Sequence, residues 1–61
     1  MSPDDFVFNS IYKGAIAKGA NESSSRKNAV KGLSDYKKNR IMKKVSNLIE
    51  DRIKTAVKES K

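Results

Sequence analysis

Apolar residues recur every three or four positions along most of this chain, a spacing typical of helices with one buried face. The most regular run lies near the C-terminus, with spacings of 3, 4, 4 and 3 between Met42, Val45, Ile49, Ile53 and Ala56. A second run, near the N-terminus, consists of Phe8, Ile11, Tyr12, Ala15 and Ile16. Both runs put their apolar side chains on one side of a helix, so the sequence predicts an all-α fold.

Capping residues divide this helical pattern into two or three helices. Ser2 can cap a helix that has Pro3 in its first turn, and Gly19 suits the left-handed position just past its end. Asn21 is a good N-cap for a second helix. We therefore expect helices near residues 3–18, 22–33 and 35–59, with the long C-terminal helix as the longest.

The direction of the apolar stripes predicts a break in the second half of the chain. If residues 22–61 formed one straight helix at about 100° per residue, Leu33 and Ile49 would lie on roughly opposite sides. A break or sharp bend between Gly32 and Arg40 would let a single core take both stripes. A continuous helix would need partners on both sides and would imply an extended dimer. We expect the break.

The apolar stripes also predict which positions are buried. The expected core consists of Phe8, Ile11, Tyr12, Ala15, Leu33, Val45, Leu48, Ile49 and Ile53. Phe6 and Val7 lie off the N-terminal stripe, so they either cover a neighbouring helix or form an apolar patch for a partner. Gly14 and the small residues around it would allow a close helix crossing. Arg52 falls within the C-terminal stripe, where it either extends along the edge of the core or pairs with an acid of a second subunit.

The chain is short and contains neither cysteine nor histidine. Its 61 residues allow one domain, residues 1–61, which buries only about 60% of its unfolded surface. Without these residue types there is no disulfide, no thiolate or imidazole ligand, and no Cys/His or Ser/His/Asp catalytic set. The adjacent acids Asp4–Asp5 and Glu50–Asp51 point about 100° apart on a helix, so neither forms an acid/base pair. We expect no metal, no cofactor and no enzymatic activity.

Positive charge is the feature with the clearest bearing on function. The net charge is +7, and residues 26–44 hold eight of the 14 Lys and Arg residues against one acid, Asp35. Such density favours a phosphate partner, because binding releases condensed counterions. The predicted contacts to nucleic acid are Arg26, Lys27, Lys31, Lys37, Lys38, Arg40, Lys43 and Lys44. We expect DNA rather than RNA; the alternative is a solvated helical face. Lys54, Lys58 and Lys61 are interspersed with acids, so we expect them to contribute little.

A helix-turn-helix motif can be tested against residues 12–40. The turn of that motif is usually about three or four residues long. Here the turn would run from Gly19 to Ser25 unless Asn21 caps the second helix at once. The motif therefore fits this sequence poorly.

A second class of function fits the same sequence. A helical protein–protein interaction module, such as a structural subunit, adaptor or inhibitor in a larger assembly (for example of a phage), would dock through an exposed apolar stripe. The apolar area is large for the thin core that one chain can close, so a homodimer is expected. No apolar run reaches the roughly 18–20 residues that span a bilayer, and the N-terminus lacks the basic start of a secretory signal. We expect no membrane partner and a cytoplasmic location.

Overall fold

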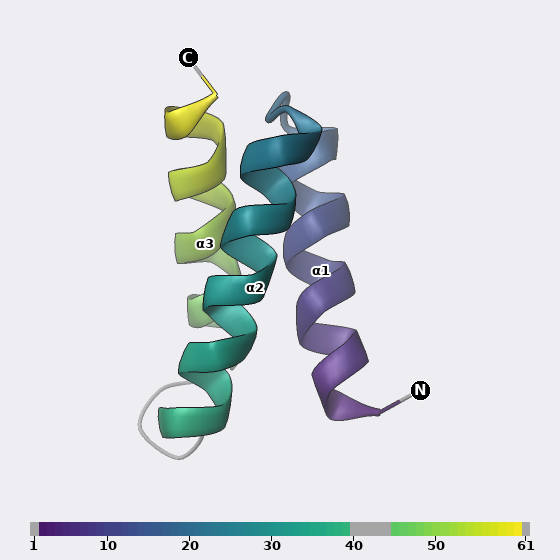
Figure 1. Cartoon of the computed structure of the whole chain (residues 1–61), viewed down its shortest axis with the longest axis vertical. Helices are drawn as coiled ribbons and strands as arrows, with labels where there is room; N and C mark the ends of the chain where they lie inside the picture. The colour runs from purple at the N-terminus through teal and green to yellow at the C-terminus, as the bar shows by residue number, and fades with distance from the viewer. Residues whose placement is uncertain (1, 40–44, 61) are drawn as a thin grey trace.

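The computed structural model describes residues 2–39 and 45–60, and the secondary structure of these two segments is entirely α-helical. The helices are α1 (Pro3–Ala17), α2 (Glu22–Asn39) and α3 (Val45–Glu59). Figure 1 shows them side by side as a bundle, with α1 and α3 running in one direction and α2 in the other. The predicted all-α fold is therefore confirmed for the described residues.

Both ends of α1 are closed by residues next to the helix. Ser2 Oγ accepts a hydrogen bond from the Asp5 backbone N–H at 3.2 Å, as an N-cap does. At the other end Gly19 adopts a φ of 103°, a left-handed conformation that glycine reaches at little cost. The Ala20 N–H then donates to the Ala15 carbonyl at 2.9 Å, which completes a Schellman motif. Both predicted ends of α1 are confirmed to within one residue.

The connection from α1 to α2 is short because Asn21 caps α2 at once. Its Oδ1 accepts from the Ser24 N–H at 2.7 Å, and its own N–H donates to Ser60 Oγ at 2.8 Å, which joins this turn to the end of α3. The two helices then run back along each other, so that Lys37 Nζ near the end of α2 lies 3.6 Å from Asp4 Oδ2 at the start of α1. They form an antiparallel hairpin, not the pair crossed at roughly 90–120° in a helix-turn-helix.

The end that we expected for the second helix, near residue 33, is wrong, although α2 does end within the interval from Gly32 to Arg40 in which we expected the break. α2 continues as a helix through Gly32 and Asp35 to Asn39. It has 18 residues against 15 in α3, so α2 is the longest helix of the described segments. Because α3 runs antiparallel to α2 and packs against it, residues 22–61 are not one straight helix (Figure 1). Arg40, at the far end of the interval predicted for the break, lies outside the described residues.

Gly32 is buried within α2, because its lack of a side chain lets both neighbouring helices pack closely against it. A Cβ built at this position would collide with Ile11 Cδ1 of α1 and would lie 2.9 Å from Arg52 Cγ of α3. Gly14 has the same role between α1 and α3, where a Cβ would collide with Ile53 Cδ1. Both glycines mark close helix crossings, which the sequence indicated for Gly14 but not for Gly32.

The centre of the bundle is built from smaller side chains than we predicted. The buried apolar residues are Val7, Ile11, Ala15, Ala20, Ala29, Ile53 and Ala56, and of these only Ile11, Ala15 and Ile53 were expected. The other predicted core residues are half-buried: Phe8, Tyr12, Leu33, Val45, Leu48 and Ile49. All of these except Leu48 pack around the buried cluster of Val7, Ile11 and Ala29. Alanine and glycine at the helix crossings bring the backbones together, so the larger side chains lie along the edges.

The two N-terminal apolar residues that lay off the predicted stripe have different environments. Val7 is 1% exposed and packs with Ile11 and Ala29, so it covers the neighbouring helix as one of our two alternatives proposed. Phe6 is 52% exposed, and its ring remains on the surface. The alternative of covering a neighbouring helix therefore holds for Val7, whereas Phe6 is exposed.

Candidate nucleic-acid interface

Five of the eight predicted contact residues lie on α2, and all five are exposed. They are Arg26, Lys27, Lys31, Lys37 and Lys38. The remaining three, Arg40, Lys43 and Lys44, lie outside the described residues. The opposite side of α2 packs against the other two helices through buried residues such as Ala29 and Gly32. The basic side chains are therefore held on the outward face of a helix whose inner face is fixed by the core.

Three of these cations form a line along α2, which we call the lysine row: Lys27, Lys31 and Lys38. At about 100° per residue they fall within about 40° of one another around the helix, and Ser34 lies between them on the same face. The row is about 16 Å long at 1.5 Å per residue. A nucleic-acid strand that rises about 3.4 Å per nucleotide would pass about five phosphates over that length. The lysine row thus has the reach for several backbone contacts.

The other two described cations are already paired. Arg26 Nη2 lies 2.8 Å from Glu22 Oε1 within α2, and Lys37 reaches Asp4 of α1. Both pairs are exposed, so each stabilises the fold by at most about 1 kcal/mol. Their positive charge is nevertheless partly offset, whereas no carboxylate in residues 2–39 and 45–60 forms an ion pair with the lysine row. Of the five described cations that the sequence predicted as contacts, the three of the lysine row therefore remain without an ion-paired acid among the described residues.

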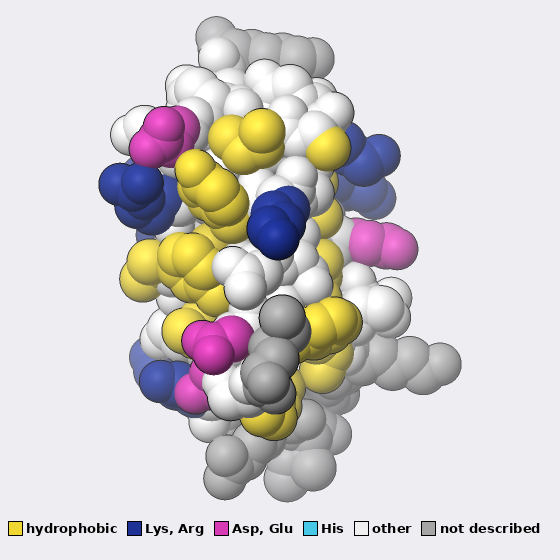
Figure 2. Space-filling model, turned by 90° about the vertical axis from the view of Figure 1, so that its right-hand side faces the viewer, with side chains coloured by type: hydrophobic (Ala, Val, Ile, Leu, Met, Phe, Trp, Pro, Cys, Tyr) yellow, Lys and Arg dark blue, Asp and Glu magenta, His cyan; other side chains and the backbone are white. Residues whose placement is uncertain are grey.

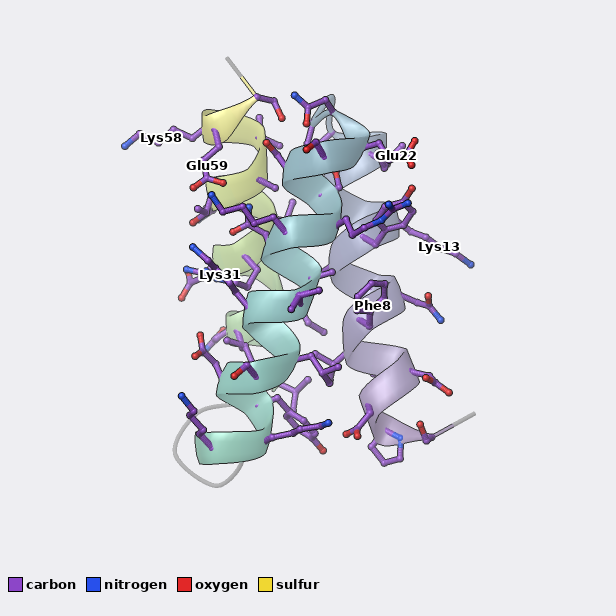
Figure 3. All side chains as sticks on the ribbon, viewed as in Figure 1. Phe8, Lys13, Glu22, Lys31, Lys58 and Glu59 are labelled. Carbon is purple, nitrogen blue, oxygen red and sulfur yellow. The ribbon has the colours of Figure 1, made fainter. Side chains whose placement is uncertain are left out.

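A polar contact between α2 and α3 borders the lysine row. Asn28 is 1% exposed; its Nδ2 donates to the Ser24 carbonyl and to Glu59 Oε1, both at 2.9 Å. Arg52 Nη1 donates to Asn28 Oδ1 at 3.5 Å. Arg52 therefore extends along the edge of the core of its own chain, the first of the two alternatives for this residue. Figure 3 shows Lys31 on the side of α2 nearest α3, with Glu59 on the facing helix.

The carboxyl group of Glu59 has a pKa below its ordinary value of 4.5. The main cause is the hydrogen bond from Asn28; desolvation, the next largest effect, raises the pKa, and the positive charges of Lys27, Lys31 and Arg52 lower it further. The ionised form is therefore the one that the folded protein stabilises. Glu59 also brings one negative charge close to the row, at its edge.

A pH dependence of stability follows from this lowered pKa. A carboxylate whose pKa is lower in the folded than in the unfolded chain contributes stability above about pH 4.5, and the contribution is lost as the pH falls through the folded pKa. We expect the free energy of unfolding, measured by urea denaturation, to decrease less for Glu59→Gln than for wild type between neutral pH and about pH 3. Asn28→Ala, which removes the donor, should reduce the pH dependence similarly. An equal loss in wild type and Glu59→Gln would contradict this assignment.

The sequence did not predict a second basic cluster, where α1 ends beside α3. Lys18, Lys54, Val57 and Lys58 line an open hollow of about 490 Å³, which we call the α1–α3 hollow. We had expected nearby acids on α3 to offset Lys54 and Lys58; of these acids, Glu59 faces Asn28 on α2. The sequence shows only that Lys54 and Lys58 are four residues apart. Lys18 lies near them because α1 packs against α3.

The described segments show neither a metal-binding cluster nor a membrane-spanning helix. In residues 2–39 and 45–60 no three acidic, histidine or cysteine side chains are grouped so that they could hold a metal ion. No helix in the same residues has both the length and the apolar character needed to cross a bilayer. Comparison with protein-family models, with curated proteins and with solved structures gave no significant match. The functional proposal therefore rests on the charge and geometry of the chain itself.

Proposed function

We propose that this protein binds nucleic acid through the phosphate backbone, with the lysine row of α2 as the principal contact. The observation that carries the proposal is the alignment of Lys27, Lys31 and Lys38 on one exposed helix face with no ion-paired acid among the described residues. Lys38, in the last turn, also complements the negative end of the helix dipole. Lys27 and Lys31 lie too far from the helix end for that role, so their placement is the stronger support.

Duplex DNA suits this surface better than single strands or RNA. Single-strand binders stack bases on aromatic side chains, whereas Tyr36, the aromatic residue of α2, is half-buried against the core. The major groove of B-DNA admits an exposed α-helix, while that of A-form RNA is too narrow and deep. Neutral and polar residues such as Ser34 separate the lysines of the row, which favours backbone contacts without base specificity.

The salt dependence of binding tests this proposal. Each neutralised phosphate contributes about −0.9 to the slope of log K against log salt concentration, so three to five contacts predict a slope of roughly −3 to −4.5. The measurement is a fluorescence-anisotropy titration of random-sequence duplex DNA between about 50 and 200 mM salt. Absence of binding at about 50 mM salt, or a slope near zero, would remove the proposal.

A second candidate function is docking to another protein, and exposed apolar residues favour it. Phe6, Ile16 and Val30 are 52%, 42% and 55% exposed. Figure 2 shows hydrophobic side chains gathered on the face that α1 presents, interrupted and flanked by Lys and Arg. Among the described residues, these are the large apolar side chains open to the expected homodimer, because Val7 and Ile53 are buried within one chain.

Sedimentation of the protein separates a homodimer from a monomer. If the homodimer forms through the exposed apolar residues, wild type should sediment as a dimer at micromolar concentration and a Phe6→Ser, Ile16→Ser, Val30→Ser variant as a folded monomer. These residues are about half exposed, so their replacement removes less buried apolar area than truncation of a core residue, and folding should survive it. A wild-type monomer would exclude the homodimer and leave docking to a different protein as the alternative.

A further inference from the structure

The α1–α3 hollow brings together three lysines from two helices. Lys18 follows the last turn of α1, and Lys54 and Lys58 lie one turn apart on α3. Below them Ala15, Ala20 and Ala56 pack together, and Val57 lies against this cluster as the apolar part of the hollow. The parallel arrangement of α1 and α3 thus fixes the positions from which the three ammonium groups extend (Figure 1).

The residues that line the hollow carry no negative charge to balance these lysines. Lys54 and Lys58 are like charges at a separation of four residues, an arrangement that destabilises a helix by a few tenths of a kcal/mol. Glu59, the acid adjacent to Lys58, is hydrogen-bonded to Asn28 on α2. Figure 3 shows Lys58 pointing outward from the bundle while Glu59 lies beneath it. A bound anion would therefore relieve the repulsion among the three lysines that line the hollow.

Helix dipoles explain part of this arrangement but not all of it. Lys18 and Lys58 stand at the C-terminal ends of α1 and α3, where a cation is favoured by about 0.3–1 kcal/mol. Lys54 lies before the last turn of α3, where that effect has decayed. The helix dipoles therefore do not account for Lys54 or for the hollow between Lys54 and Lys18.

We infer that the α1–α3 hollow is a second phosphate-binding site, and that through it one protein molecule holds two segments of nucleic acid. The inference rests on the proposed function of the lysine row. No residue of α2 lines the hollow, and the lysine row is on the outward face of α2. Double-stranded DNA is straight over such distances, because its persistence length is about 50 nm. A duplex bound along α2 therefore leaves the hollow free for a second segment.

A capture experiment tests this inference. A short random duplex is immobilised, the protein is bound to it, excess protein is washed away, and a fluorescent duplex of the same length is added. Wild type should retain the second duplex. The variant Lys18→Gln, Lys54→Gln, Lys58→Gln should still bind the immobilised duplex but should retain less of the second by on the order of tenfold or more, because up to three phosphate contacts are lost. The three lysines are exposed, and circular dichroism would verify that the variant is folded.

The possible outcomes separate this inference from the function on which it rests. Failure of wild type to bind even the immobilised duplex would contradict the proposed function. Binding of the first duplex without capture of the second would overturn the present inference alone, as would equal capture by wild type and the variant, which is what bridging by a protein dimer would give. A free phosphate ion is the other source of the same chemistry. If inorganic phosphate shifts the NMR signals of Lys18, Lys54 and Lys58 but no second duplex is captured, the site takes phosphate without bridging, and the inference is overturned.

Discussion

Ile11→Ala should leave this protein largely unfolded. Ile11 is fully buried at the crossing of α1 with α2, and truncation of such a side chain costs about 2–5 kcal/mol, since it removes buried apolar area and leaves a cavity. A single core in a domain of this size rarely supplies more than about 3–5 kcal/mol of net stability. The expected result is loss of the helical circular-dichroism signal, or a urea midpoint close to zero.

Ile16→Ala is the matched control for this prediction. It makes the same chemical change on the same helix, but Ile16 is 42% exposed. Surface substitutions of this kind usually change stability by no more than about 0.5 kcal/mol. Equal effects of the two substitutions would mean that the inner face of α1 is assigned wrongly.

The largest effect on binding is expected from neutralising the lysine row. Lys27→Gln, Lys31→Gln, Lys38→Gln removes up to three phosphate contacts, which should flatten the salt slope by about 2.7 and weaken duplex binding at about 50 mM salt by on the order of 10³-fold. The fold should be retained because the three side chains are exposed and no ion pair in the described segments involves them. The measurement is an anisotropy titration with the protein in excess over duplex.

The triple variant of Lys18, Lys54 and Lys58 is the matched control for charge. It removes the same three positive charges from another part of the surface. If binding of a single duplex is centred on α2, this control should weaken that binding only a few-fold, even though we expect it to reduce capture of a second duplex by on the order of tenfold or more. Comparable losses in both triple variants would show diffuse attraction by net charge rather than a site on α2.

Local signals predicted the helix ends well, because a cap depends on few neighbours. Ser2 and Asn21 cap their helices with their own side chains, and Gly19 takes the left-handed conformation that the chain needs after Lys18. The end predicted for the second helix near residue 33 was wrong, because a glycine such as Gly32 looks the same in sequence whether it weakens a helix near its end or admits a neighbouring helix. Only the tertiary contacts with Ile11 and Arg52 decide between these two possibilities.

The composition of the core could be predicted only in part, since it depends on how closely the helices approach. Periodicity favoured the large side chains Phe8 and Tyr12, which stack on each other at 6.4 Å between ring centres but remain half-buried. The close crossings instead place Ala29 and the buried polar Asn28 at the centre. Nothing in the local sequence distinguishes Asn28 from an exposed asparagine, because its partner Glu59 is 31 residues away.

The sequence predicted that the basic residues of α2 lie on its exposed side, but not which of them form ion pairs. The density of lysine and arginine correctly indicated the exposed side of α2, because the apolar residues had already assigned the other side to the core. The pairing of Lys37 with Asp4, and the meeting of Lys18 with Lys54, required knowledge of how the helices pack. These contacts concentrate the unpaired charge of α2 in the lysine row.

The position of bound DNA at residue resolution shows whether the lysine row of α2 is the contact surface. NMR spectra of the lysine ammonium groups, recorded with and without a short random duplex in equal amount, report each side chain separately. We expect the signals of Lys27, Lys31 and Lys38 to shift and broaden most, while that of Lys13, which points away from α2 on the outer side of α1, should hardly change (Figure 3). A shift of Lys13 as large as that of Lys27, or no shift of the lysine row at a concentration where the duplex is bound, would contradict this expectation.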